Sequence, residues 1–260
     1  MVTSLWGAAS PPVSLVSVAG AVGAPFQQPI PGLDVLLKGP ASKYGNLSPA
    51  ECRRRLAATS GHDAFMSVGP SNGIAAPERV IGPISGVQFL VPPKKSPFGI
   101  LDCRQALLWL ELAPILVAHG VVSVQIDNFY RNRASVRPGR KSQHAYALAA
   151  DVTALTFGPL QDQATSKTGA AVPDGSGRTV VEDDFLGQLG QPVCGPGARI
   201  IPRPESDLDQ AARATRLRNL VCELARLGAF HHILTPNYNQ AHRNHLHLDL
   251  QRDNKWFSVQ

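Results

Sequence analysis

The chain has 260 residues, of which 43% are hydrophobic and 17% are charged, and the charged share falls below the roughly 25% of an average soluble domain. Glycine and proline number 23 and 22, and together they stay below the roughly 25–30% that marks low-complexity chains. This composition indicates a globular protein with one sizeable domain or two small ones. The longest apolar stretch, residues 4–26, is interrupted by Pro11, Pro12 and Pro25, which excludes a membrane-spanning helix there.

The charge balance is basic, with a net charge of +6 and an isoelectric point of about 9.4. Such a charge suits a polyanionic partner, either a nucleic acid or an anionic cell-envelope polymer. The basic residues are densest between Arg131 and Lys141, and no run of aromatic residues accompanies them. Because no nucleic-acid-binding motif is present, we expect no nucleic-acid partner.

Cysteines and the N-terminal segment bear on the compartment of the protein. The four cysteines form no C-x-x-C pair, which excludes a ribbon-type structural zinc site; they are Cys52, Cys103, Cys194 and Cys222. An even number fits two disulfides in an exported protein and buried thiols in a cytosolic one, and both options remain open. The first 26 residues are small and apolar but lack a basic start, so they are either a weak signal peptide or a flexible lead.

In chain order, the sequence predicts an irregular arm over residues 1–46 and then a domain over residues 47–260. The domain opens with a helix over Pro49–Thr59, because Ser48 and Glu51 form a capping box and proline takes the first helical position. A stretch rich in Gly, Pro and Ser follows. The remaining predicted elements are a strand near 87–91, a helix from Asp102 to about His119, strands at 121–126 and 149–157, one strand at 178–182 within a long polar segment (158–204), a helix from Ser206 to Gly228, and strands at 230–234 and 245–250. This order predicts an α+β fold with a mainly antiparallel sheet and flanking helices.

Histidines crowd the C-terminal end of the chain. Five of the eight fall within the last 30 residues: His231, His232, His242, His245 and His247. In the predicted strand 245–250, His245, His247 and Asp249 alternate with three leucines. One face therefore packs leucines on the core, and the other carries two imidazoles and a carboxylate, which is typical of a metal site on the sheet.

A second motif supplies further ligand types. In SQHAYALAADVT, His144 and Asp151 are seven residues apart with small residues between them, so the histidine before the strand and the aspartate on it can converge. Two neutral imidazoles and one carboxylate would leave the fourth position of zinc open for a water molecule, whose pKa zinc lowers to about 7. Any one of these histidines taken alone is as well explained as a surface or hydrogen-bonded core residue; the two motifs together favour a metal site.

The two motifs together resemble the lysostaphin, D-Ala-D-Ala peptidase and hedgehog superfamily of zinc proteins. The pattern S-x-H-x-x-G-x-A-x-D followed by H-x-H is matched by Ser142, His144, Ala149, Asp151, His245 and His247. Within that superfamily the chain looks most like the extensin-like C-terminal domain, through the blocks LDCRQALLWL, SQHAYALAADV and TPNYNQAHRNHLHLDL of residues 48–250. Ala147 stands where the family usually has glycine, and alanine is costly there if the position needs a positive φ.

The resemblance implies a role for each residue of the site. The zinc ligands are His144, Asp151 and His247, and His245 acts as general base or hydrogen-bonds the tetrahedral intermediate. His242 completes an H-x-x-H-x-H spacing that is similar to the penicillin-insensitive murein endopeptidases, where both outer histidines flank the metal. In the dipeptidase branch a glutamate lies three residues before the ligand histidine. Asn244 occupies that position here and cannot take a proton, which favours His245 as the base.

Two further assignments follow from the same resemblance. The dipeptidase branch has an arginine that stabilises developing negative charge, and Arg131 is its nearest equivalent, with Arg133 as the alternative. A solvated loop arginine remains the competing interpretation of both. Asp249 either anchors an imidazole from behind or replaces Asp151 as a metal ligand.

The function that the resemblance implies is zinc-dependent hydrolysis of amide bonds in peptidoglycan peptides, of endopeptidase or carboxypeptidase type. We accordingly expect an extracytoplasmic protein, periplasmic or secreted, with Zn2+ as cofactor and peptidoglycan or its peptides as partner. The alternative is a non-catalytic, zinc-containing module that binds the cell wall or a partner. Such a module could lose His245 without losing its function, so the presence of His245 and His242 favours the enzyme.

Overall fold

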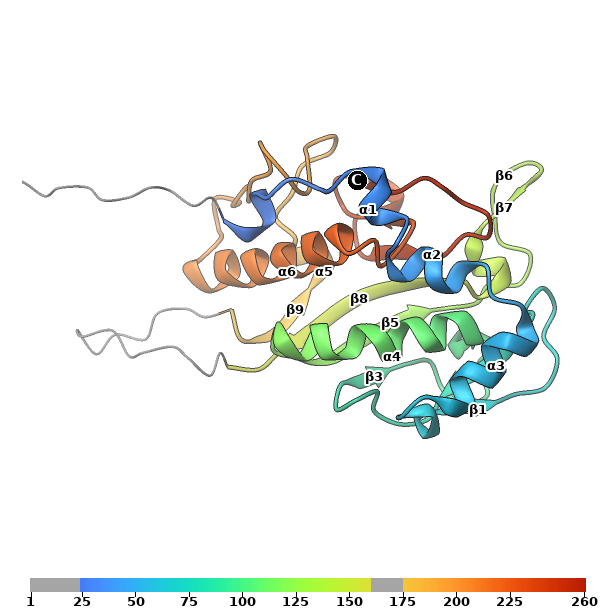
Figure 1. Cartoon of the computed structure of the whole chain (residues 1–260). Coiled ribbons are helices and arrows are strands. Elements are labelled where there is room, and N and C mark those ends of the chain that lie inside the picture. Colours follow the sequence, from blue (N-terminus) through green and yellow to red (C-terminus); the bar gives the residue numbers. More distant parts are fainter. Residues whose placement is uncertain (1–23, 160–174) are drawn as a thin grey trace, which may run out of the picture.

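A mixed sheet of seven strands organises the fold (Figure 1). The structure, a computed structural model, describes residues 24–159 and 175–260. The strand order is β12-β10-β11-β8-β5-β3, with β9 also paired to β8, and the strands are β3 (Gln88–Leu90), β5 (Val121–Asn128), β8 (Ala149–Phe157), β9 (Gly177–Val180), β10 (His232–Leu234), β11 (Leu246–Asp249) and β12 (Ser258–Val259). Within the described ranges, β3–β5 and β10–β12 are the parallel pairs and the other pairs are antiparallel. The predicted α+β class with a mostly antiparallel sheet is confirmed.

Strand β8 is the centre of this sheet and fixes the register of the site. One of its edges pairs with β5, while the other pairs first with β11, over residues 149–152, and then with β9, over residues 154–157. In this register Asp151 is the partner of Asn128 on β5 and of His247 on β11. The three residues therefore lie in one row across three strands.

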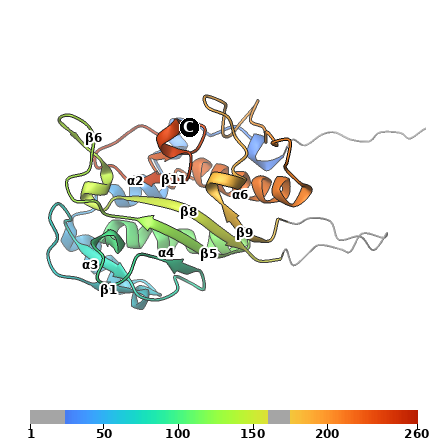
Figure 2. The same cartoon turned by 180° about the vertical axis from the view of Figure 1, so that it is seen from behind.

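Two long helices cover one face of the sheet, as Figure 1 shows from the helix side and Figure 2 from behind. They are α4 (Cys103–Ala118) and α6 (Leu208–Arg226). Leu246 and Leu248 of β11 line the same interior space as Trp109 of α4 and Leu220 of α6. Because side chains alternate along a strand, His247 and Asp249 lie on the opposite face, away from the helices.

The helices begin where side chains cap them. Asp102 accepts a hydrogen bond from the Arg104 backbone N at 3.1 Å at the start of α4, and Ser48 accepts one from the Glu51 N at 3.2 Å at the start of α3 (Pro49–Ala58). Both caps confirm the sequence prediction. Helix α6 begins at Leu208, two residues after the predicted start at Ser206, because Asp207 is its cap.

The N-terminal part of the described chain differs from the expected irregular arm. Residues 25–45 include three short helices, η1 (Pro25–Gln27), α1 (Leu33–Leu36) and α2 (Pro40–Gly45), and they bury Phe26, Ala41 and Tyr44 in the core. The segment reaches the end of α6, where the Ala41 N donates to the Gly228 carbonyl at 3.0 Å. Helices this short show no apolar periodicity in a sequence. Residues 1–23, with the signal peptide or flexible lead, lie outside the described residues.

Several short elements were not predicted. In the region expected to be rich in loops, β1 (Phe65–Ser67), β2 (Pro77–Val80) and β4 (Ile100–Asp102) form a second, three-stranded sheet. A hairpin joins β6 (Ser135–Arg137) to β7 (Arg140–Lys141) within the basic stretch. Within the long polar segment 158–204, residues 160–174 lie outside the described part. The strand predicted at 178–182 corresponds to β9. The other short helices are η2 (His62–Ala64), η3 (Pro97–Gly99), η4 (Gln143–Tyr146), α5 (Val181–Asp184) and η5 (Gln240–His242).

All four cysteines form disulfides. Cys52–Cys103 joins α3 to the first residue of α4, and Cys194–Cys222 ties a loop to α6. Disulfides persist in oxidising compartments outside the cytosol, so the two bridges are consistent with the expected extracytoplasmic location. None of the helices in the described ranges is long and apolar enough to cross a membrane.

Candidate metal centre

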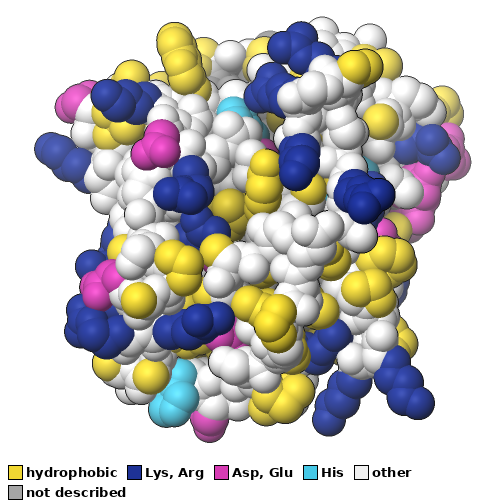
Figure 3. Space-filling view, turned by 90° about the vertical axis from the view of Figure 1, so that its right-hand side faces the viewer, with side chains coloured by type: hydrophobic (Ala, Val, Ile, Leu, Met, Phe, Trp, Pro, Cys, Tyr) yellow, Lys and Arg dark blue, Asp and Glu magenta, His cyan; other side chains and the backbone are white. Residues whose placement is uncertain are grey.

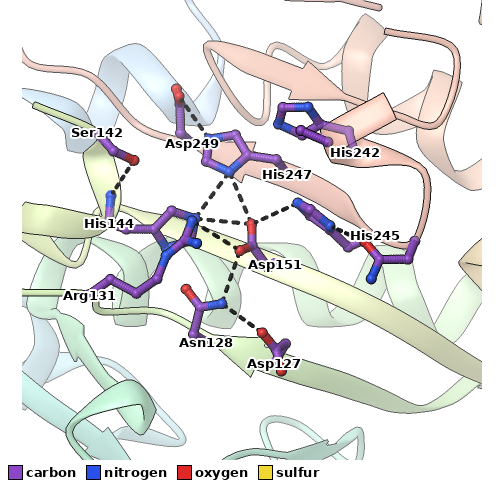
Figure 4. A network of polar contacts seen from close by, with 12 residues as sticks. Asp127, Asn128, Arg131, Ser142, His144, Asp151, His242, His245, His247 and Asp249 are labelled. Carbon is purple, nitrogen blue, oxygen red and sulfur yellow. Dashed lines mark hydrogen bonds and ion pairs between the residues drawn. The ribbon is translucent and has the colours of Figure 1, made fainter. Parts of the chain in front are cut away.

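Three buried side chains converge on the open face of the sheet (Figure 4). The His144 Nε2 lies 3.0 Å from the Asp151 Oδ1 and 3.1 Å from the His247 Nδ1, and the His247 Nδ1 lies 3.0 Å from the same carboxylate oxygen. Four-coordinate zinc with bonds of about 2.0–2.1 Å separates its ligand atoms by about 3.3–3.4 Å. The group His144, Asp151 and His247 therefore has both the atoms and the spacing of a metal site.

The local backbone brings His144 to the strand that carries Asp151. Ser142 caps the turn η4, and its Oγ accepts from the His144 N at 3.3 Å. The turn ends at Ala147, whose φ of 52° is left-handed. The position thus has the positive φ that favours glycine, as the family resemblance suggested. This reversal lets the chain enter β8 with His144 above Asp151.

Hydrogen bonds on the outer atoms fix which nitrogen of each ring faces inward. The His144 Nδ1 donates to the Phe129 carbonyl at 3.0 Å, and the His247 Nε2 donates to the Asp249 Oδ2 at 3.3 Å. With those protons outside, the neutral rings present bare lone pairs toward each other and toward the Asp151 carboxylate. Three electron-pair donors around one point repel each other unless a proton or a metal cation lies between them. This arrangement fits the chemistry of a metal ion.

The charges of the site reflect the same contacts. Burial would raise the pKa of the Asp151 carboxyl, but hydrogen bonds with His144 and His247 hold it well below its usual range. Burial would lower the pKa of His247, yet the flanking carboxylates of Asp151 and Asp249 raise it to about 9. When no metal is bound, a proton on His247 therefore offsets part of the negative charge of the two carboxylates.

His245 and His242 lie beside this group. The His245 Nε2 lies 3.4 Å from the Asp151 Oδ1, and the His245 Nδ1 is 2.9 Å from the Asn244 Oδ1. The His242 ring lies 5.2 Å from the ring of His245, and its Nδ1 contacts the Asn239 Oδ1 at 2.7 Å. Burial lowers the pKa of both rings, that of His242 to about 4. His242, His245 and His247 form a second group of ligand types within 4.8 Å of one another.

Of the two predicted arginines, Arg131 reaches the site. Its Nη2 lies 3.5 Å from the Asp151 Oδ2, and its side chain is half exposed. No hydrogen bond or ion pair among the described residues links Arg133 to this group. The geometry thus favours Arg131 over Arg133, which the sequence alone left as alternatives.

Asp249 lies behind the His247 ring rather than among the inward-facing atoms. Its second oxygen, Oδ1, accepts from the His232 Nδ1 at 2.9 Å, and the two residues are partners in the pairing of β10 with β11. Among the described residues, neither group with metal-ligand spacing includes Asp249. The geometry supports the anchoring role and not the replacement of Asp151 as a ligand.

The sequence analysis missed Asn128 and His232. The Asn128 Nδ2 donates to the Asp151 Oδ2 at 3.0 Å and to the Asp127 Oδ2 at 2.9 Å, and so turns the other oxygen of Asp151 toward the rings. Only the pairing of β5 with β8 places Asn128 there, and no local spacing signals it. His232 belongs to the histidine cluster in the sequence, but no local spacing indicates its contact with Asp249.

Comparison with known proteins agrees with part of the resemblance. Residues 197–259 match the family described as Extensin-like protein C-terminus. The match contains His242, His245, His247 and Asp249 and leaves His144 and Asp151 outside. No curated protein and no solved structure matches the chain. The comparison therefore supports an extensin-like C-terminal segment, and the geometry adds a possible metal site to it.

Proposed function

We propose that the protein is a zinc-dependent hydrolase that cleaves amide bonds in peptidoglycan peptides outside the cytoplasm. The observation that carries this proposal is the convergence of three donor atoms, from His144, Asp151 and His247, that all lie within 4.8 Å of one another. Two imidazoles and one carboxylate are the donor set of hydrolytic zinc sites, which keep a fourth position open. Zinc held there would lower the pKa of a bound water molecule and polarise an amide carbonyl.

The chain's own residues divide the remaining tasks. His245 carries its Nδ1 proton toward Asn244, which leaves the Nε2 lone pair facing the metal group as a general base. Arg131 extends over Asp151 from the solvent side, where its guanidinium can stabilise negative charge that develops on a carbonyl oxygen. His242 contacts His245 from the outer side and completes the wall of the site.

The second candidate function is a zinc-containing module that binds the cell wall or a partner without catalysis. One observation favours it: hydrogen bonds to Phe129, Asn128 and Asp249 orient the three ligand side chains. Metal binding therefore needs neither His245 nor Arg131. The enzyme and the module thus share the metal site and differ in the role of His245.

Metal content and turnover distinguish these functions. The purified protein should hold about one zinc by elemental mass spectrometry, and His144→Ala or His247→Ala should remove it. His245→Ala should keep zinc while hydrolysis of peptidoglycan peptides, followed by liquid chromatography and mass spectrometry, falls by roughly 10²-fold or more.

Arg133→Ala is the matched control, because it removes a nearby arginine that makes no contact with the site, and it should leave both measurements unchanged. Full zinc content in His144→Ala would show that the ligand assignment is wrong. A zinc-loaded wild type that binds peptidoglycan and cleaves none of its peptides would establish the binding module instead.

A further inference from the structure

A cavity of about 360 Å³ opens directly beside the candidate metal group. Its floor is the open face of β10, β11 and β12, and the β6–β7 hairpin forms a wall. His247 lines this cavity and belongs to the metal group, and Ser142, which also lines the cavity, caps the turn that carries His144. A substrate held at the metal therefore has room to extend under the hairpin.

The acidic side chain in the lining of the cavity already has a hydrogen-bond partner on each oxygen. It is Asp249, whose Oδ1 lies 2.9 Å from the His232 Nδ1 and whose Oδ2 lies 3.3 Å from the His247 Nε2. Apart from the two histidines, Arg140 and Lys141, the other polar side chains of the lining are amides and hydroxyl groups, among them Gln143 and Gln251. Such groups can hydrogen-bond a ligand of either charge.

Two cationic side chains lie at the wall of the cavity. Arg140 and Lys141 of β7 line the cavity, and among the described residues neither has a carboxylate partner. Lys141 instead lies over the ring of Tyr146, 5.6 Å from its centroid. In Figure 3, which faces the hairpin side, Lys and Arg side chains (dark blue) stand close to the recess in which histidine (cyan) is visible. An anionic group in the cavity would meet two positive charges at the wall and hydrogen-bond donors at the floor.

We propose that this cavity is the substrate subsite for a carboxylate, held by Arg140 and Lys141 next to the scissile bond. The inference rests on the proposed hydrolase function and adds the substrate class: peptides with a free carboxylate on the side of the scissile bond that lies under the hairpin. The forked donors of arginine match a carboxylate, and the ammonium of Lys141 adds a second charge.

The test compares two ligands that differ only in charge. One is a purified peptidoglycan stem peptide with free carboxylates, and the other is the same peptide with its carboxylates converted to carboxamides. Binding is measured by calorimetry on the metal-free protein, so that hydrolysis does not intervene. We expect the wild type to prefer the carboxylate form about tenfold, and the double variant R140Q/K141Q to lose that preference without weaker binding of the carboxamide form.

Arg137→Gln is the matched control, since Arg137 lies in the same hairpin on β6 but does not line the cavity; it should keep the preference. Equal binding of the two peptides by the wild type, binding of neither, or equal weakening of both in the double variant would overturn the subsite. Hydrolysis by the zinc-loaded wild type is scored separately. Turnover without charge preference rejects the subsite alone, and charge preference without turnover rejects the hydrolase alone.

Discussion

Asn128 shows at the scale of one residue how the metal group is held. Its amide nitrogen lies between the Asp127 and Asp151 carboxylates, at 2.9 and 3.0 Å. Because Asp151 gives its Oδ2 to this contact, its Oδ1 remains for the two histidine rings. Ser142, the Phe129 carbonyl and Asp249 orient the rings in a similar way. Metal binding by this site should therefore depend on residues that touch no metal.

The first prediction concerns Asn128. Asn128→Ala should weaken zinc binding by about 10- to 100-fold, the usual effect of removing a group that orients a ligand. Competition with a chelator of known affinity measures it. Asp127→Ala is the control, because it leaves the contact between Asn128 and Asp151 in place and should change the zinc affinity little. An unchanged affinity in Asn128→Ala would mean that Asp151 needs no orientation.

The second prediction concerns His231, which lies outside the metal group. Burial lowers the pKa of His231 to about 4, and its Nδ1 accepts from the Gln251 N at 3.0 Å. The unfolded chain takes up this proton near pH 6.5 and the folded chain only near pH 4. The free energy of unfolding should therefore fall between pH 6.5 and pH 4, by up to about 3 kcal/mol, and this part of the loss should stop below pH 4.

Urea unfolding at several pH values measures that fall. His231→Gln should be less stable at pH 7 but should lose less stability between pH 6.5 and pH 4 than the wild type. His62→Gln, at an exposed position, is the control and should follow the wild type. The same slope in His231→Gln as in the wild type would assign the acid sensitivity to other groups.

At the scale of elements, covalent bonds and close backbone contacts fix the positions of the helices relative to one another. The Cys52–Cys103 disulfide joins α3 to α4 across 51 residues of sequence. At the end of α6, the backbone of Gly39, which precedes α2, passes close to that of Gly228. A Cβ at position 39 would lie 2.2 Å from the Leu227 carbonyl oxygen, and one at position 228 would lie 2.7 Å from the Leu36 carbonyl oxygen. The N-terminal helices can lie there because both crossing residues are glycines.

The third prediction follows from the disulfide. Replacing both cysteines, in C52A/C103A, should lower the free energy of unfolding by about 2–5 kcal/mol, chiefly because the unfolded chain gains freedom. Thermal unfolding with and without a reducing agent measures this. The reductant should lower the midpoint of the wild type more than that of the double variant, which retains only Cys194–Cys222. Equal sensitivity of the two proteins would show that the Cys52–Cys103 bridge contributes little.

The fourth prediction tests the glycine crossing. Gly39→Ala should destabilise the fold by about 1–3 kcal/mol, because the added methyl group overlaps a backbone oxygen that cannot move freely. Gly69→Ala is the matched control: a Cβ at position 69 would meet no atom within 4 Å, so its effect should stay within about 0.5 kcal/mol. Equal stability of the two variants by urea unfolding would show that residues 24–46 are not firmly attached to α6.

For the whole molecule, the sequence predicts best those features that have a local signature. Alternation in 245–250 and the spacing of His144 and Asp151 place His247 and Asp151 on strands that the structure contains, and His144 before the second of them. The capping residues Ser48 and Asp102 correctly predict where α3 and α4 begin. These signals are local because a strand face, a cap and a histidine motif each occupy a few consecutive residues.

The features that the sequence missed depend on contacts between distant segments. Asn128 meets Asp151 only through the pairing of β5 with β8, and His232 meets Asp249 only through that of β10 with β11. The three-stranded sheet of β1, β2 and β4 consists of strands of three or four residues, which are too short for a periodic pattern. The helices of residues 25–45 are likewise short, and their place beside α6 depends on the glycine crossing.

The row of paired residues across β5, β8 and β11 has a consequence for the order of events during synthesis. Two of the proposed ligands come from residues 144–151, but the third, His247, follows Asp151 by 96 residues. A growing chain thus carries an incomplete donor set until this whole stretch has been made and β11 has paired with β8. Metal binding would then indicate that the sheet is complete, and the proposed hydrolysis would require molecules in which β11 is in place.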